Sequence, residues 1–110
     1  ELASQGAQLI VVPTSWADGP GKLEQWRLLT AARALDSISY IVAAGQSRPG
    51  GDAEAGNPSG PTGIGHSTIV DPNGVRMAEA GYEDDILYAD IDPNEVAKTR
   101  RALPVVATVD

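Results

Sequence analysis

Two short apolar runs, at residues 7–14 and 39–44, constrain the fold of this chain more than any other feature. Both are rich in branched side chains and neither alternates with polar residues, which is typical of strands buried on both faces. Between them, residues 22–36 carry apolar side chains at helical spacing, namely Leu28, Ala31, Ala32 and Leu35. The order strand, helix, strand predicts a parallel pair with a right-handed crossover.

The second half of the chain predicts a hairpin, a strand and a helix. Residues 66–70 and 75–80 flank Asp71-Pro72-Asn73-Gly74, which has the residue preferences of a type I turn. Residues 86–91 predict a further strand. Asp92 and Pro93 then favour the start of a helix that ends near residue 102. The chain is therefore expected to form an α/β fold with about five strands and two complete helices.

Two segments leave alternatives open. Residues 1–5 favour a helix and Gly6 suits a left-handed C-terminal cap, so they predict the last turn of a helix that begins upstream of residue 1. A frayed N-terminal tail is the alternative. Residues 46–63 are rich in Gly, Pro, Ser, Asp and Asn, and a loop of that length is either a functional flap or simply mobile.

The predicted elements do not supply enough cover for the predicted sheet. Two helices shield little more than one face, and each exposed apolar Å² forfeits about 25 cal/mol of burial free energy. We therefore expect more polypeptide, from the same gene product or from a partner, to cover the other face.

Composition excludes several classes of function. Eight Lys and Arg against fifteen Asp and Glu give a net charge of -7, which argues against nucleic acid and anionic membrane surfaces as partners. No apolar run approaches the roughly 20 residues of a membrane span and no signal peptide opens the chain, so a cytoplasmic location is expected. There is no Cys, which excludes disulfides, thiolate metal sites and a cysteine nucleophile within these residues.

Local motifs give no catalytic group. Gly21-Lys22 lacks the rest of a phosphate-binding loop. His66 and Ser67 are adjacent on a predicted strand and so point to opposite faces, which prevents them from acting as a base and nucleophile pair. The cluster Glu83-Asp84-Asp85 is interpreted as a solvated turn, so neither a catalytic residue nor a metal ligand is predicted.

The order of several weak motifs nevertheless resembles the carbon-nitrogen hydrolase (nitrilase) superfamily, and especially its omega-amidase and deaminated-glutathione amidase branch. These motifs are Gln8-Leu9-Ile10-Val11-Val12-Pro13, Trp16, Gly19-Pro20, Trp26, Arg33-Ala34-Leu35-Asp36, Tyr40-Ile41-Val42-Ala43-Ala44, Gly65-His66-Ser67, Asp71-Pro72-Asn73-Gly74 and Asp90-Ile91-Asp92. The resemblance implies a four-layer α-β-β-α sandwich with a mixed sheet. Residues 1–110 would form the C-terminal part of a single such domain, whose N-terminal half is missing.

The resemblance also implies a chemistry. The whole protein would hydrolyse the C–N bond of small non-peptide amides or nitriles without a cofactor, through a Cys nucleophile supported by Lys and Glu. All three residues would lie upstream, with residue 1 a few positions after the Cys. The implied partners are a small amide substrate, the missing N-terminal half and further copies in a homodimer or higher oligomer.

Thr14, Ser15 and Trp16 are the predicted substrate-binding residues, because by resemblance they follow the strand next to the nucleophile. A core position is an equal alternative for Trp16 and the favoured one for Trp26, and Asp36 is interpreted as a structural group at a helix end. The alternative function is a noncatalytic acidic α/β module that binds a partner through its uncovered sheet face.

Overall fold

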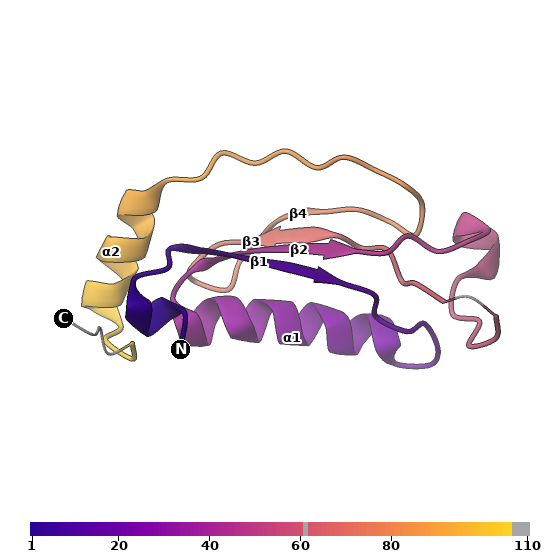
Figure 1. The fold of residues 1–110 in the computed structure, drawn as a ribbon, viewed down its shortest axis with the longest axis horizontal. Coiled ribbons are helices and arrows are strands. Elements are labelled where there is room, and N and C mark those ends of the chain that lie inside the picture. Colours follow the sequence, from indigo (N-terminus) through magenta and orange to yellow (C-terminus); the bar gives the residue numbers. More distant parts are fainter. Residues whose placement is uncertain (61, 107–110) are drawn as a thin grey trace.

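A parallel strand pair extended by an antiparallel hairpin forms the sheet. The computed structural model describes residues 1–60 and 62–106. Strands β1 (Leu9–Thr14) and β2 (Tyr40–Gly45) are parallel and joined by helix α1 (Lys22–Ser37). Strands β3 (Thr68–Val70) and β4 (Arg76–Glu79) continue antiparallel in the order β1-β2-β3-β4 (Figure 1). The predicted strand-helix-strand unit, the hairpin and the mixed sheet are confirmed.

The local signals at turns and helix ends act as predicted. The amide of Gly74 donates to the carbonyl of Asp71 (2.9 Å) in the hairpin turn. Helix α2 (Pro93–Ala102) begins after Asp92, whose side chain accepts from the amide of Asn94 (2.9 Å). At the N-terminus, the short 3-10 helix η1 (Ala3–Gln5) ends at Gly6, whose φ of 102° is left-handed. The chain thus opens with a helical turn and not with the frayed tail that was the alternative.

Helix α1 covers one face of the sheet, over β2 and β3. Ile41 and Val70 share that face through the strand register and are buried against Trp26 and Ala34 of the helix. The indole Nε1 of Trp26 donates to the carbonyl of His66 (2.8 Å), and Trp26 is 4% exposed. Trp26 is therefore a core residue, as favoured from the sequence.

The other face of the sheet is covered unevenly. Val11, Val42 and Ile69 form one row across that face; Val11 is 59% exposed and Ile69 only 8%. The chain after β4 arcs over β3 and β4 on this side (Figure 1). Leu87 from this segment and Ile69 from β3 line the same cavity. Helix α2 lies beside the amino ends of β1 and β2 and not on a face, held there by Arg100, which donates to the carbonyl of Ala7 (2.7 Å).

Two sequence predictions are wrong for this structure. Residues 7–14 were expected to be buried on both faces, but β1 is an edge strand and most of its residues are exposed. Residues 86–91 form no strand, so the described part of the chain has four strands and not about five. Their exposure still alternates residue by residue, which is an extended conformation without a neighbouring strand to pair with.

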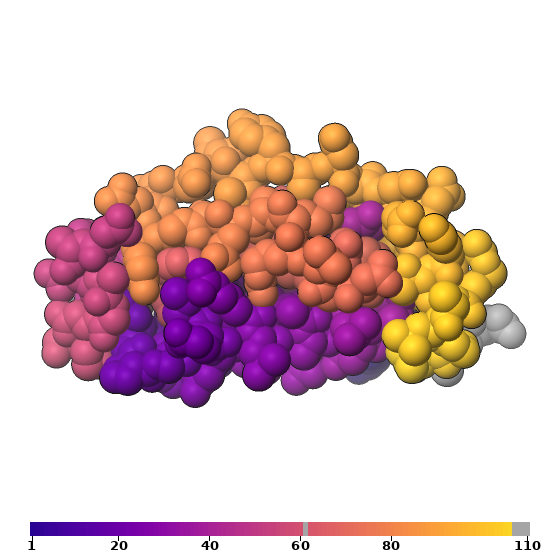
Figure 2. Space-filling model, turned by 180° about the vertical axis from the view of Figure 1, so that it is seen from behind, coloured from indigo at the N-terminus to yellow at the C-terminus, as the bar shows by residue number. Residues whose placement is uncertain are grey.

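The molecule is long for its size. Its Cα radius of gyration is 15.0 Å and its extents are 47 × 23 × 19 Å, whereas a compact domain of this length has a radius of about 13 Å. Figure 2 shows residues 46–60 at one end and α2 at the other. No helix among the described residues is long and apolar enough to cross a membrane.

Arg27, Arg76 and Glu79 form an ion cluster at the surface of the sheet. This cluster predicts that the stability of the fold depends on pH. The guanidinium of Arg27 contacts both oxygens of Glu79 (2.7 and 3.0 Å), and Arg76 lies 3.6 Å from the same carboxylate. Burial alone raises the pKa of Glu79, but the hydrogen bond and charge of Arg27 and the charge of Arg76 outweigh it and leave that pKa lowered. Because the folded pKa lies below the unfolded one, the stabilisation is complete above the unfolded pKa and is lost as pH falls through the folded pKa.

We expect Glu79→Gln to lower the free energy of unfolding by on the order of 1 kcal/mol at neutral pH, and by much less once the carboxylate is protonated. Urea titrations at several pH values measure this. Asp36→Asn is the matched control, because Asp36 and Arg33 form a mostly exposed pair (2.9 Å). Equal losses for the two variants, or a loss that does not change with pH, would contradict the prediction.

The hydrogen bond from Trp26 provides a second test of the core. Trp26→Phe keeps most of the ring but leaves the carbonyl of His66 without its indole donor, which should cost about 1 to 3 kcal/mol. Thermal and denaturant unfolding measure the loss. Tyr88→Phe, at a side chain that is 84% exposed, should change stability by less than about 0.5 kcal/mol. A Trp26→Phe variant as stable as Tyr88→Phe would refute the assignment.

Candidate functional site

The predicted substrate-binding residues lie at the carboxyl end of β1. Thr14 is the last residue of β1 and its carbonyl accepts from the amide of Gln46 (3.0 Å), which follows β2. Ser15 is exposed and Trp16 half-buried. The ends of two neighbouring parallel strands thus meet at one edge, which is where open α/β sheets bind ligands.

Trp16 is anchored on the core at this edge. Its ring centroid lies 6.2 Å from that of Trp26, and its Nε1 donates to the carbonyl of Lys22 (2.9 Å). The ammonium of Lys22 lies 5.7 Å from the Trp16 ring. The indole therefore packs partly on the core, and its half-exposed remainder is what a ligand could contact.

A small polar cavity lies beside this edge, at the carboxyl end of β2. It has a volume of about 290 Å³ and is lined by residues 45–47, 65–67 and 83–85 and by Ala80. The hydroxyl of Ser47 donates to Asp84. Gln46 and Ser47 were not predicted from the sequence, although they follow the carboxyl end of a parallel strand just as residues 14–16 do.

His66 lies at the wall of this cavity and is buried. Its φ of 50° is left-handed, and its ring is 4.6 Å from Tyr82 in an edge-on arrangement. The Nδ1–H donates to the carbonyl of Ile64 (2.6 Å). Burial, followed by the charge of Asp18, raises the pKa of Tyr82. The hydroxyl of Ser67 accepts from the amide of Gly45 (3.0 Å). Residues 66–70 were predicted as one strand with His66 and Ser67 on opposite faces, but β3 begins at Thr68, so that reason does not apply and the exclusion of a base and nucleophile pair stays a prediction.

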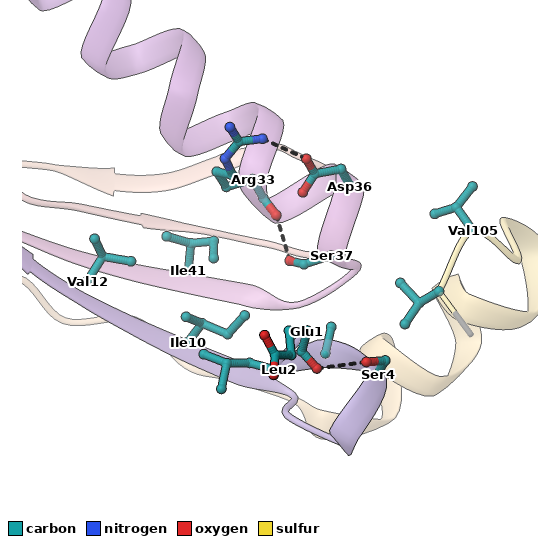
Figure 3. A pocket seen from close by; sticks show the side chains of 12 residues that line it. Glu1, Leu2, Ser4, Ile10, Val12, Arg33, Asp36, Ser37, Ile41 and Val105 are labelled. Carbon is teal, nitrogen blue, oxygen red and sulfur yellow. Dashed lines mark hydrogen bonds and ion pairs between the residues drawn. The ribbon is translucent and has the colours of Figure 1, made fainter. Parts of the chain in front are cut away.

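A larger cavity lies at the other end of the molecule. It has a volume of about 650 Å³ and runs between η1, β1 and α1, with Ile10, Val12 and Ile41 on its floor and Leu2 and Val105 at its end (Figure 3). Thr14, Ser15 and Trp16 do not line it. Among residues 1–60 and 62–106, no group of three or more His, Cys, Asp or Glu residues is placed to hold a metal ion.

Comparison with known proteins connects this arrangement to one family. The family model described as carbon-nitrogen hydrolase matches residues 1–101. A protein named as a hydrolase in Mycobacterium tuberculosis is 51% identical over 109 residues, which are 96% of this chain and 39% of that protein. The deaminated glutathione amidase of Escherichia coli is 41% identical over 104 residues, 94% of this chain and 35% of the amidase.

The fold also matches solved structures of the family. A variant of the amidase from Nesterenkonia sp., which carries the acetamide moiety of fluoroacetamide on its active-site cysteine, aligns with a TM-score of 0.63 and 29% identity. The alignment covers 91% of this chain and 34% of the amidase. The chain thus spans only 34 to 39% of the length of these three proteins. The resemblance seen in the sequence is confirmed: the chain belongs to the carbon-nitrogen hydrolase family.

Proposed function

We propose that residues 1–110 are the C-terminal part of one amidase domain, and that the rest of the domain carries the catalytic residues. The observation that supports this most directly is the family match over residues 1–101 in a chain that has no Cys and spans a little over a third of its relatives. The reaction proposed for the whole protein is hydrolysis of the C–N bond of small non-peptide amides.

The 650 Å³ cavity between η1, β1 and α1 indicates where the segment that carries the nucleophile would lie. Ile10 and Val12 share the face of Ile41, but α1 packs on β2 and β3, so a groove runs along β1 with η1 at one end (Figure 3). A helix that ended at Gly6 and lay in this groove would run antiparallel to β1. About a dozen helical residues span about 18 Å, close to the length of a six-residue strand, so this helix would begin level with Thr14.

A Cys at the beginning of that helix would therefore face the corner formed by Thr14, Ser15 and Trp16. We propose these three residues as one wall of the substrate pocket. In the proposed mechanism the thiolate attacks the amide carbon, a carboxylic acid gives its proton to the leaving ammonia, and water then releases the acyl group as an acid. An upstream Lys would stabilise the oxyanion. The residues described here would position the substrate and take no part in bond making.

Exposed apolar surface supports the remaining parts of the proposal. Val11 on one face of β1 and Val12 on the other are suited to burial by the rest of the domain. Leu28 and Leu35 are 71% and 43% exposed on the outer side of α1, which suits a homodimer or higher oligomer. The competing proposal is a noncatalytic module that binds a partner through the uncovered face of the sheet. Activity of the full-length protein separates the two proposals.

We expect the full-length gene product to contain a reactive thiol and to release ammonia from a small dicarboxylic acid monoamide. Replacing the cysteine that precedes Glu1 by Ala should lower kcat by about 10³-fold or more. Tyr88→Phe, at an exposed position outside the proposed site, is the matched control and should leave kcat unchanged. Absence of thiol-dependent ammonia release, or a native product of 11.4 kDa with no thiol-bearing partner chain, would favour the binding module.

The proposed pocket wall can be tested at Ser15, which is exposed at the end of β1. Ser15→Leu adds bulk there and should lower kcat/KM by about tenfold through displaced substrate, with stability changed by less than about 0.5 kcal/mol. Ala97→Leu on the exposed side of α2 adds comparable bulk at the opposite end of the molecule. Steady-state kinetics that were the same for both variants would exclude Ser15 from the wall.

A further inference from the structure

Residues 46–60, which we name the strand-end loop, follow β2, and residues 63 and 65 lie against the start of this loop. The amide of Gly65 donates to the carbonyl of Gln46 (2.8 Å), and a Cβ on Gly63 would collide with the carbonyl oxygens of Gln46 and Ser47. Residues 63 and 65 therefore bring the chain back to the point where the loop leaves β2. Such a closed surface loop, packed by its own side chains, is frequently functional.

Arg48 fixes the inside of this loop. Its side chain is 2% exposed, its Nη2 donates to the carbonyl of Ser59 (3.2 Å), and the same atom lies 3.9 Å from the carboxylate of Glu54. The short 3-10 helix η2 (Gly51–Glu54) closes this part of the loop. The loop is thus held from inside by Arg48, and its first residues are also held from outside, because the amide of Arg48 donates to the carbonyl of Tyr82 (2.7 Å).

Asp18 joins the strand-end loop to that corner. It is 5% exposed; one carboxylate oxygen accepts from the amide of Gly19 (2.7 Å) and the other from the amide of Gly56 (2.8 Å), 38 residues away. The backbone of the loop also lies close, because a Cβ on Gly19 would stand 3.6 Å from that of Pro58. Asp18 lies two residues after Trp16, so its carboxylate links the loop to the proposed pocket wall.

We propose that Asp18 is a positioning residue of the amidase, which fixes the strand-end loop beside Thr14–Trp16 so that the loop selects among acyl groups of different length. This inference rests on the proposed function. The loop follows the carboxyl end of a parallel strand, where α/β proteins bind ligands. Arg48 holds the inside of the loop, and its amide holds the start of the loop on the carbonyl of Tyr82 (2.7 Å), so loss of the Asp18 carboxylate should free the far part of the loop around Gly56 without unfolding it.

The experiment uses the full-length gene product and two monoamides, succinamate and adipamate. Asp18→Ala should reduce the ratio of their kcat/KM values by about tenfold, mainly through KM, and kcat for the preferred substrate should fall far less. Asp18→Asn keeps the volume and one acceptor oxygen, so we expect a smaller reduction of the ratio. A ratio unchanged in both variants would overturn the proposal.

Asp71→Ala is the matched control. The Asp71 carboxylate also accepts two backbone amides, from Asn73 (2.8 Å) and Val75 (3.0 Å), but it lies in the hairpin turn at the other end of the sheet. This variant should lose comparable stability and keep the wild-type selectivity ratio. If Asp71→Ala changed the ratio as much as Asp18→Ala, the effect would be general destabilisation and the inference would fail.

Cleavage after Glu54 by a glutamate-specific protease gives a readout that does not depend on activity. Asp18→Ala should be cleaved there faster than wild type and faster than Asp71→Ala. Equal cleavage rates would overturn the positioning role even if the enzyme were active. An inactive wild-type protein would instead refute the proposed function, so the two failures can be told apart.

Discussion

The four-stranded sheet is covered unevenly, and this unevenness explains both its buried core and its open groove. Helix α1 shields β2 and β3 on one face, and the chain after β4 shields β3 on the other. Strand β1 has neither, so Ile10 and Val12 line an open groove and Val11 is exposed on the far side. An apolar edge strand left open on both faces is a surface suited to association, because burying it returns free energy in proportion to its area.

The parallel pairing of β1 and β2 has a consequence at the opposite end of the sheet. It places the residues after both strands side by side, and the bond from Gln46 to Thr14 fixes that corner. Trp26 packs against this corner from helix α1, through its ring contact with Trp16 and its hydrogen bond to the carbonyl of His66. The same packing that stabilises the core therefore also sets the geometry of the proposed pocket wall.

Local signals predicted most of the elements because their causes are local. Gly6 adopts a left-handed conformation after η1, Asp92 caps α2, and Asp71 closes the hairpin turn, each through bonds within a few residues. Residues 86–91 were mispredicted as a strand because a ladder needs a neighbouring strand, which a propensity for extended structure does not provide. Likewise, the apolar pattern of β1 predicts that the strand needs burial, but it does not state which polypeptide supplies it.

The strand-helix-strand order, the hairpin, the family resemblance and the lack of Cys can all be read from the sequence, because they follow from residue types and their spacing along the chain. Only the tertiary structure decided that β1 is an edge strand, that α2 lies beside the sheet and not on it, and that Asp18 reaches Gly56. The difference lies in how far apart in the sequence the interacting residues are. Caps and turns are closed by neighbours in sequence, whereas cover of a face and the partner of a buried carboxylate depend on segments that meet only once the chain has folded.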